Sequence, residues 1–242
     1  AWSDETRICG EVARTRDIRA AIAPILGAKR VPLDRVRANT AVFYSISDCQ
    51  GGLAGVTFGS FLIKQVVADI SRDFPRLSNF VTLSPAPNFG EWLRRERSTP
   101  GSPALSEADR GALAKLDEED WWNDRAVLAE LRDPIMRAAA TYYMTARDRR
   151  GFPIDQVARF HLGNGARLER LNWPADLSAR ARKQSFGLMV NYLYDLGDIE
   201  KNHEAFAETR AVIATSAVRK LARPIRALVP APAKVETVAP SA

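Results

Sequence analysis

The sequence predicts an α/β (α+β) fold, in which helices pack on a sheet. Residues 41–47 (AVFYSIS) and 79–84 (NFVTLS) are rich in β-branched and aromatic side chains, as strands are. Between them, from residue 57 to 74, apolar residues recur at helical spacing. The order strand, helix, strand predicts a β-α-β unit with parallel strands.

The segments that follow continue this pattern. The run DCQGGLAG (48–55) contains three glycines and predicts a loop, and Pro75 ends the first helix. Residues 98–104 (STPGSPA) form a connection. Ser106 and Asp109 have the spacing of a capping box for a helix over 107–118.

The next helices are expected at 123–132 and from Asp133 to Gly151, with Pro134 in the first turn of the second. Strands then resume at 154–162 and 166–173. The run FGLMVNYLY (186–194) is either a strand or a buried helix end, and a strand is preferred. A last helix is predicted over 200–221. The Pro/Ala-rich residues 223–242 lack periodicity and are expected to be disordered.

Composition excludes several classes of protein. No apolar run approaches the roughly 18 residues that span a membrane, and AWSDETRICG does not resemble a secretory signal, so a cytoplasmic location is expected. Cys9 and Cys49 are too few for a disulfide framework. The formal charge of +6 is spread along the chain without a nucleic-acid-binding motif, and it equally suits a phosphorylated small molecule.

The loop before the first long helix is a candidate anion site. GLAGVTFGS (52–60) would present backbone N–H groups at a helix N-terminus, where a pyrophosphate is stabilised. A glycine-containing turn without a ligand is the alternative. The loop matches neither the Walker motif nor the dinucleotide fingerprint Gly-x-Gly-x-x-Gly.

Ser84 and His161 are the candidate reactive groups. Ser84 closes a strand beside the β-α-β crossover, where open α/β sheets bind ligands, although a turn serine before proline is the simpler interpretation. His161 lies between two apolar residues, and it is either a packed core residue or a proton-transfer group. His203 lies among charged residues and is discounted. No Gly-x-Ser-x-Gly or His-Glu-x-x-His pattern surrounds these residues, so neither a hydrolase nucleophile nor a catalytic metal is expected.

Four segments together resemble one known family. TAVFYSISDCQGGLAGVTFGSFLIKQVV, FVTLSPAPNF, FHLGNGARLERLNW and GLMVNYLY are similar to the catalytic domain of malonyl-CoA decarboxylases, in the family's order and spacing. The resemblance implies a fold of the GNAT acyltransferase superfamily over residues 1–222, with a helical insert at about 91–150. It also implies cleavage of malonyl-CoA to acetyl-CoA and carbon dioxide. CoA is then part of the substrate, and no separate cofactor is expected.

The resemblance assigns roles to individual residues. Ser84 and His161 match the catalytic serine and histidine, and Tyr194 matches a functionally important tyrosine. Asn164 is a further candidate for orienting His161 or the thioester oxygen. The acyl-CoA loop corresponds to Ala54, Gly55, Val56, Thr57, Phe58, Gly59 and Ser60.

The sequence also departs from the family. Ala54 stands where GNAT proteins usually carry Gln or Arg. Family members have an upstream helical domain and further strands, and RICGEVARTRDIRAAIAPIL (7–26) is more polar than the strand expected there. We therefore expect a catalytic domain without its first strands, whose exposed sheet edge favours a homo-oligomer.

The implied mechanism uses the thioester carbonyl as the electron sink. Ser84 would hydrogen-bond the malonyl group, and His161, with an imidazole pKa near ~6.5, would protonate the enolate carbon. Two alternatives stay open. One is a GNAT-type acyltransferase that moves an acyl group from CoA to an amine, and the other is an inactive acyl-CoA-binding remnant.

Overall fold

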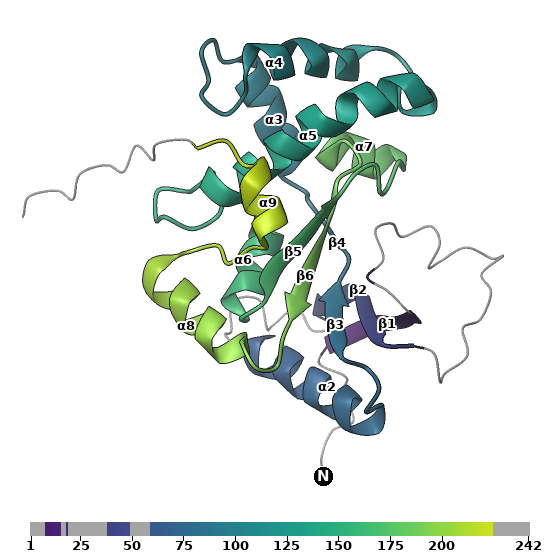
Figure 1. The fold of residues 1–242 in the computed structure, drawn as a ribbon, viewed down its shortest axis with the longest axis vertical. Helices are drawn as coiled ribbons and strands as arrows, with labels where there is room; N and C mark the ends of the chain where they lie inside the picture. The colour runs from purple at the N-terminus through teal and green to yellow at the C-terminus, as the bar shows by residue number, and fades with distance from the viewer. Residues whose placement is uncertain (1–7, 16–17, 19–37, 49–58, 225–242) are drawn as a thin grey trace, which may run out of the picture.

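The computed structural model describes residues 8–15, 18, 38–48 and 59–224, and a mixed sheet with helices around it forms its centre (Figure 1). Its strands are β1 (Ile8–Thr15), β2 (Thr40–Asp48), β3 (Asn79–Thr82), β4 (Ser84–Pro85), β5 (Arg167–Asn172) and β6 (Met189–Tyr194). Its α-helices are α2 (Gly59–Asp73), α3 (Phe89–Ser98), α4 (Glu107–Leu113), α5 (Arg125–Thr145), α6 (Gln156–Gly163), α7 (Ala179–Ser185), α8 (Ile199–Thr209) and α9 (Ser216–Leu221). Short 3-10 helices are η2 (Ala114–Asp117) and η3 (Trp121–Asn123).

The predicted β-α-β unit is present. β2 and β3 are parallel neighbours, with Ala41 opposite Phe80, and α2 connects them. The strand order is β1-β2-β3-β6-β4, and β5 also pairs with β6. Apart from the β2–β3 pair, these pairings are antiparallel. The predicted strand at 79–84 is divided at Leu83, so that Ser84 begins β4.

β1 corrects the expectation that the polar N-terminal segment supplies no strand. Ile8–Thr15 pairs with β2 along its whole length, from Ile8 opposite Asp48 to Thr15 opposite Thr40. Polar residues are compatible with a strand in this position because, among the described residues, β1 lies at the edge of the sheet. Self-association through such an edge stays a prediction, which light scattering on the purified protein measures directly.

The two faces of the sheet carry separate apolar clusters, as the period of two along a strand requires. On one face, Ala41, Phe43 and Phe80 join the main core beneath the helices. The other face holds a smaller cluster of Val42, Val81, Leu83, Ala175, Met189 and Leu193. The side chains that could carry chemistry lie on the helix-covered face.

The chain between β4 and β5, which includes the predicted helical insert, is mostly helical, although its helix boundaries differ from those expected. Ser106 caps α4 as predicted, accepting a hydrogen bond from the Asp109 N–H at 3.0 Å. The expected break at Asp133 is wrong, because α5 continues through Pro134 to Thr145. Proline removes one backbone hydrogen bond, and burial of the apolar face that includes Leu131, Ile135 and Ala138 compensates for it.

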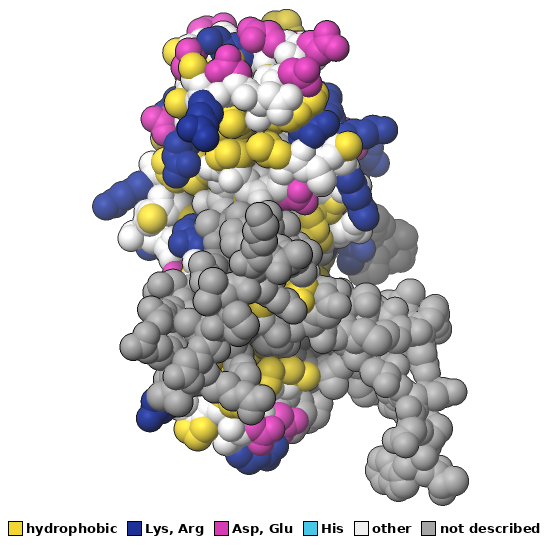
Figure 2. Space-filling model, turned by 90° about the vertical axis from the view of Figure 1, so that its right-hand side faces the viewer, with side chains coloured by type: hydrophobic (Ala, Val, Ile, Leu, Met, Phe, Trp, Pro, Cys, Tyr) yellow, Lys and Arg dark blue, Asp and Glu magenta, His cyan; other side chains and the backbone are white. Residues whose placement is uncertain are grey.

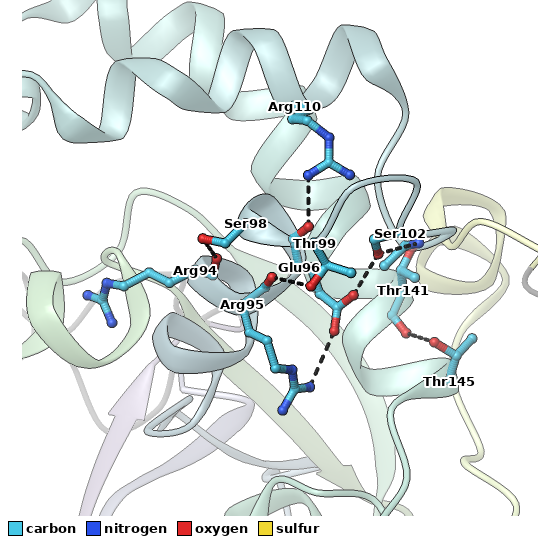
Figure 3. A network of polar contacts seen from close by, with 10 residues as sticks. Arg94, Arg95, Glu96, Ser98, Thr99, Ser102, Arg110, Thr141 and Thr145 are labelled. Atoms are coloured by element: carbon cyan, nitrogen blue, oxygen red, sulfur yellow. Dashed lines mark hydrogen bonds and ion pairs between the residues drawn. The ribbon is translucent and has the colours of Figure 1, made fainter.

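Polar contacts join the elements of the insert (Figure 3). Arg110 of α4 donates to the Glu96 carbonyl of α3 at 2.8 Å, and Ser102 donates to the Glu96 carboxylate at 2.6 Å. The backbone N–H of Arg223, beyond α9, donates to Thr141 of α5 at 3.0 Å. The first two bonds join residues within the insert, and the third links α5 to the segment that follows α9.

The predicted last helix is two helices. Arg210 adopts a left-handed backbone (φ 59°) that ends α8. An extended segment then bonds beside β5, where the Leu168 N–H donates to the Ile213 carbonyl at 2.8 Å, before Thr215 caps α9. The hydrogen bonds to β5 therefore stabilise an extended segment where a continuous helix was predicted.

The outer face seen in Figure 2 carries acidic and basic side chains interspersed over the helical insert, with apolar side chains between them. No helix within residues 59–224 is long and apolar enough to cross a bilayer. The predicted disorder at 223–242 lies almost entirely outside the described residues.

Candidate active site

Ser84 lies directly after the break at Leu83, which separates β3 from β4. It is the first residue of β4 and is 6% exposed, and its Oγ is 3.1 Å from Nε2 of His161. A second contact, of 3.0 Å, joins Ser84 Oγ to Oγ1 of Thr82. The structure thus brings the two reactive residues predicted from the sequence into direct contact.

His161 comes from a helix, which corrects the prediction of a strand over 154–162. Asp155 caps α6, accepting the Ala158 N–H at 2.9 Å, and the buried residues Ala158, His161 and Leu162 follow at intervals of three and four. This spacing is helical rather than alternating. His161 therefore lies in the last turn of α6, facing β6 and Ser84.

Tyr194 completes the site from the last position of β6. Its hydroxyl is 2.8 Å from Nδ1 of His161, and the phenol is 1% exposed. Both ring nitrogens of His161 thus have a hydroxyl partner, Tyr194 on one side and Ser84 on the other. These two contacts fix the orientation of the imidazole ring, with Nδ1 facing Tyr194 and Nε2 facing Ser84.

Burial decides the charge state of these groups. It lowers the pKa of His161 to about 3 because the charged form is desolvated. Burial likewise raises the pKa of Tyr194 above its ordinary value. At neutral pH the site contains a neutral imidazole and a neutral phenol, which corrects the expectation that His161 keeps an ordinary pKa near ~6.5.

Two residues of this site were missed from the sequence. The ring of Tyr192 stacks on the imidazole of His161, with centroids 4.6 Å apart and planes 26° apart. Thr82 contacts Ser84, as described above. Strand periodicity was the available signal, since Tyr192 shares a strand face with Tyr194, and Thr82 shares one with Ser84.

The glycine-rich turn after His161 has a packing function. Asn164, the C-cap of α6, is buried, and its N–H bonds to the carbonyls of Phe160 and His161, at 3.1 Å each. A role for its side chain in orienting substrate stays a prediction. Gly165 has a φ of +80°, and a Cβ there would lie 2.1 Å from the Ile199 carbonyl oxygen of α8.

We expect Gly165→Ala to lower the free energy of unfolding by about 2–4 kcal/mol, through the left-handed backbone and the overlap with α8. Gly163→Ala is the matched control, because its Cβ would meet only Phe206 ring carbons, at 3.7 Å, in a helical residue. Urea denaturation compares the two variants. Equal stabilities would show that the Gly165 turn imposes no constraint.

The structure describes only part of the predicted acyl-CoA loop. Ala54 to Phe58 lie outside the described residues, and Gly59 and Ser60 form the first turn of α2. α2 thus follows β2 and precedes β3 in the chain, as expected for the helix of the β-α-β unit. The second histidine, His203, lies on α8 and contacts the Gly163 carbonyl at 2.5 Å, outside the Ser84–His161–Tyr194 group.

Arg167, Arg170 and Arg180 follow His161 in the chain, and a guanidinium group there could meet a substrate carboxylate. Arg167 instead pairs with Glu169 at 2.7 Å, and Arg170 donates to the Ile18 carbonyl at 2.7 Å. Arg180 lies on α7 and bonds to Gln184 at 3.3 Å. The structure thus gives each of these guanidinium groups a partner within the protein.

Comparison with known proteins identifies the family. The sequence model of the malonyl-CoA decarboxylase C-terminal domain matches residues 1–233. The mitochondrial malonyl-CoA decarboxylase of Anser anser anser is 34% identical over 236 residues, which cover 88% of this chain and 46% of that protein. The Mus musculus enzyme is 35% identical over 210 residues, which cover 78% of this chain and 42% of that protein.

Solved structures agree. The malonyl-CoA decarboxylase from Rhodopseudomonas palustris superposes with a TM-score of 0.87 at 53% identity, over 90% of this chain and 50% of that one. The Agrobacterium vitis protein gives 0.83 at 51% identity, over 88% and 53%. The chain spans about half the length of the relatives it matches. It belongs to the malonyl-CoA decarboxylase C-terminal domain family.

Proposed function

We propose that this protein decarboxylates malonyl-CoA to acetyl-CoA and carbon dioxide at the Ser84–His161–Tyr194 site. The observation that carries the proposal is the buried contact of 3.1 Å between Ser84 and His161, with Tyr194 at the other ring nitrogen. These residues occur at the positions where the sequence resembles the family's catalytic motifs. Relatives that bear the name of this activity are about one third to one half identical to the chain.

The reaction divides into bond cleavage and protonation. The bond between the carboxylate carbon and C2 breaks, carbon dioxide leaves, and the electron pair enters the thioester as an enolate. A new C2–H bond then forms with one proton supplied by the protein, which solvent later replaces. The thioester carbonyl itself accepts the electrons, so the chemistry requires no separate organic cofactor.

His161 serves this reaction as a neutral hydrogen-bond donor. A buried imidazole of depressed pKa can polarise or protonate an enolate without first becoming an imidazolium, as the neutral histidine of triosephosphate isomerase polarises a carbonyl. The Nε2 atom faces Ser84, and the imidazole N–H is the hydrogen that we assign to the malonyl group. Tyr194 holds the other ring nitrogen and therefore the orientation of the ring.

CoA binding is assigned to Ala54–Ser60 at the start of α2. Backbone N–H groups at a helix N-terminus stabilise a pyrophosphate without side-chain ligands, which suits a loop that has Ala54 in place of Gln or Arg. Binding energy gained at this end of the substrate, remote from the scissile bond, can be used to orient the malonyl group.

Turnover of malonyl-CoA in D₂O tests the proposal. We expect carbon dioxide and acetyl-CoA in equal amounts, with one deuterium in each acetyl methyl group, because C2 takes one proton from exchangeable groups. Parallel incubations contain acetyl-CoA and an amine acceptor. Acyl transfer to the amine without release of carbon dioxide would establish an acyltransferase instead. Thermal stabilisation by acetyl-CoA without any turnover would establish an acyl-CoA-binding remnant.

A further inference from the structure

The hydrogen-bond ladder between β3 and β6 is interrupted next to Ser84. Val81 lies opposite Leu193 and Ser84 lies opposite Val190, so the register is kept across the gap. The backbone N–H of Leu83 instead donates to Phe43 of β2, at 2.8 Å. The backbone groups of β6 that lie opposite Thr82 and Leu83 must therefore find other hydrogen-bond partners.

Thr82 replaces the missing ladder bonds. The Tyr192 backbone N–H donates to its side-chain Oγ1 at 3.3 Å, and the Asn191 side-chain amide donates to its carbonyl at 2.8 Å. Thr82 is 1% exposed. Its hydroxyl oxygen, 3.0 Å from Ser84 Oγ, thus connects β6 directly to the reactive serine.

The Ser84 hydroxyl has one hydrogen and two possible acceptors. Thr82 Oγ1 lies at 3.0 Å and His161 Nε2 at 3.1 Å. If the hydrogen points to Nε2, His161 must carry its proton on Nδ1 and donate it to Tyr194. If it points to Thr82, Nε2 carries the proton and donates it to Ser84, since a neutral imidazole has one donor and one acceptor nitrogen.

Tyr194 favours one of these two directions. A phenol is a stronger hydrogen-bond donor than an imidazole N–H, and an imidazole nitrogen is a stronger acceptor than a phenol oxygen. The contact of 2.8 Å is therefore best made by the Tyr194 O–H donating to Nδ1. That choice places the proton of His161 on Nε2, and it is available only if the Ser84 hydrogen has an acceptor other than Nε2, which Thr82 supplies.

We propose that Thr82 is a positioning residue, which accepts the Ser84 hydroxyl hydrogen and thereby holds His161 in the tautomer with its N–H directed at Ser84. The hydrogen bonds then run in one direction, from Tyr194 through His161 and Ser84 to Thr82. The donor hydrogen of the imidazole faces the reactive serine before substrate arrives. The kinetic consequence rests on the proposed decarboxylation, whereas the tautomer itself does not.

Nitrogen NMR of protein carrying ¹⁵N-histidine tests the tautomer directly. The chain has only two histidines, and His203→Gln removes the second signal. We expect wild-type His161 to be protonated at Nε2. In Thr82→Val, which keeps the β-branched shape but lacks the hydroxyl, the Ser84 hydrogen turns to Nε2 and the proton moves to Nδ1. Thr82→Ser, which keeps the hydroxyl, retains the wild-type pattern.

Kinetics supply the second measurement. We expect Thr82→Val to lower kcat for malonyl-CoA about tenfold, the effect of one hydrogen bond, with little change in KM and recovery in Thr82→Ser. A wild-type Nδ1–H tautomer, or a Thr82→Val spectrum identical to wild type, would overturn the proposal. Should Thr82→Val not fold, Thr82→Ala removes the same hydroxyl, and the wild-type spectrum remains decisive. A protein that shows the tautomer change but no decarboxylation would refute the proposed function alone.

Discussion

His161→Gln is expected to lower kcat for malonyl-CoA decarboxylation by about 10²- to 10⁴-fold, the range over which a positioned proton-transfer group acts. Glutamine is polar and of similar reach, so it can still contact Ser84 and Tyr194. It cannot relay a proton between two ring nitrogens. KM should change much less, because the CoA site that we propose lies at the start of α2, apart from His161.

The chain supplies a matched control in its other histidine. His203→Gln makes the same substitution at a residue that contacts the end of α6, through the Gly163 carbonyl. We expect its kcat to stay within about twofold of wild type, since it touches none of the reacting groups. Steady-state release of carbon dioxide measures both variants. A His161→Gln protein that is folded and turns over at the wild-type rate would remove His161 from the mechanism.

The strands that carry the site could be predicted from the sequence because their signal is local. β2, β3 and β6 are dense in β-branched and aromatic residues, and the helix between β2 and β3 is long and amphipathic. Two parallel strands that are connected by a helix are almost always joined by a right-handed crossover. The position of Ser84 at the end of the predicted strand 79–84 followed from that, whereas Tyr194 was assigned through the family resemblance.

The helix that carries His161 could not be recognised in the same way. Its eight residues contain Val157 and Phe160, which favour strands, and its cap, Asp155, is a residue equally common in turns. Tertiary burial of Asp155 decides the outcome: the carboxylate is 1% exposed and accepts from both the Ala158 N–H and the Tyr142 hydroxyl. Such a contact with α5 is not visible in a local window.

The roles of Thr82 and Tyr192 depend on register, which no single strand specifies. Thr82 faces Ser84 and receives the Tyr192 N–H only because β3 and β6 keep one alignment across the break at Leu83. A shift by one residue would move both side chains to the opposite face. The family resemblance indicated the serine and the histidine, whereas the contacts of Thr82 with Ser84 and of Tyr192 with His161 emerge from the pairing of strands.

The second large effect expected is acid destabilisation that originates at His161. The folded-state pKa, about 3, is below the ordinary value of 6.5. Below pH 6.5 the unfolded chain therefore binds a proton that the folded protein does not bind. The free energy of unfolding decreases as the pH is lowered from 6.5 to about 3. The shift corresponds to roughly 4–5 kcal/mol over the whole window.

A difference measurement isolates this contribution, because the carboxylates that also titrate in this range are shared by wild type and variant. Denaturation of both proteins between about pH 7 and about pH 4 should show wild type losing about 3 kcal/mol more than His161→Gln. Tyr194→Phe should keep the wild-type slope, because burial rather than the Tyr194 bond depresses the pKa. Parallel slopes for wild type and His161→Gln would mean that the imidazole is solvated in the folded protein, and the neutral donor proposed for catalysis would lose its physical basis.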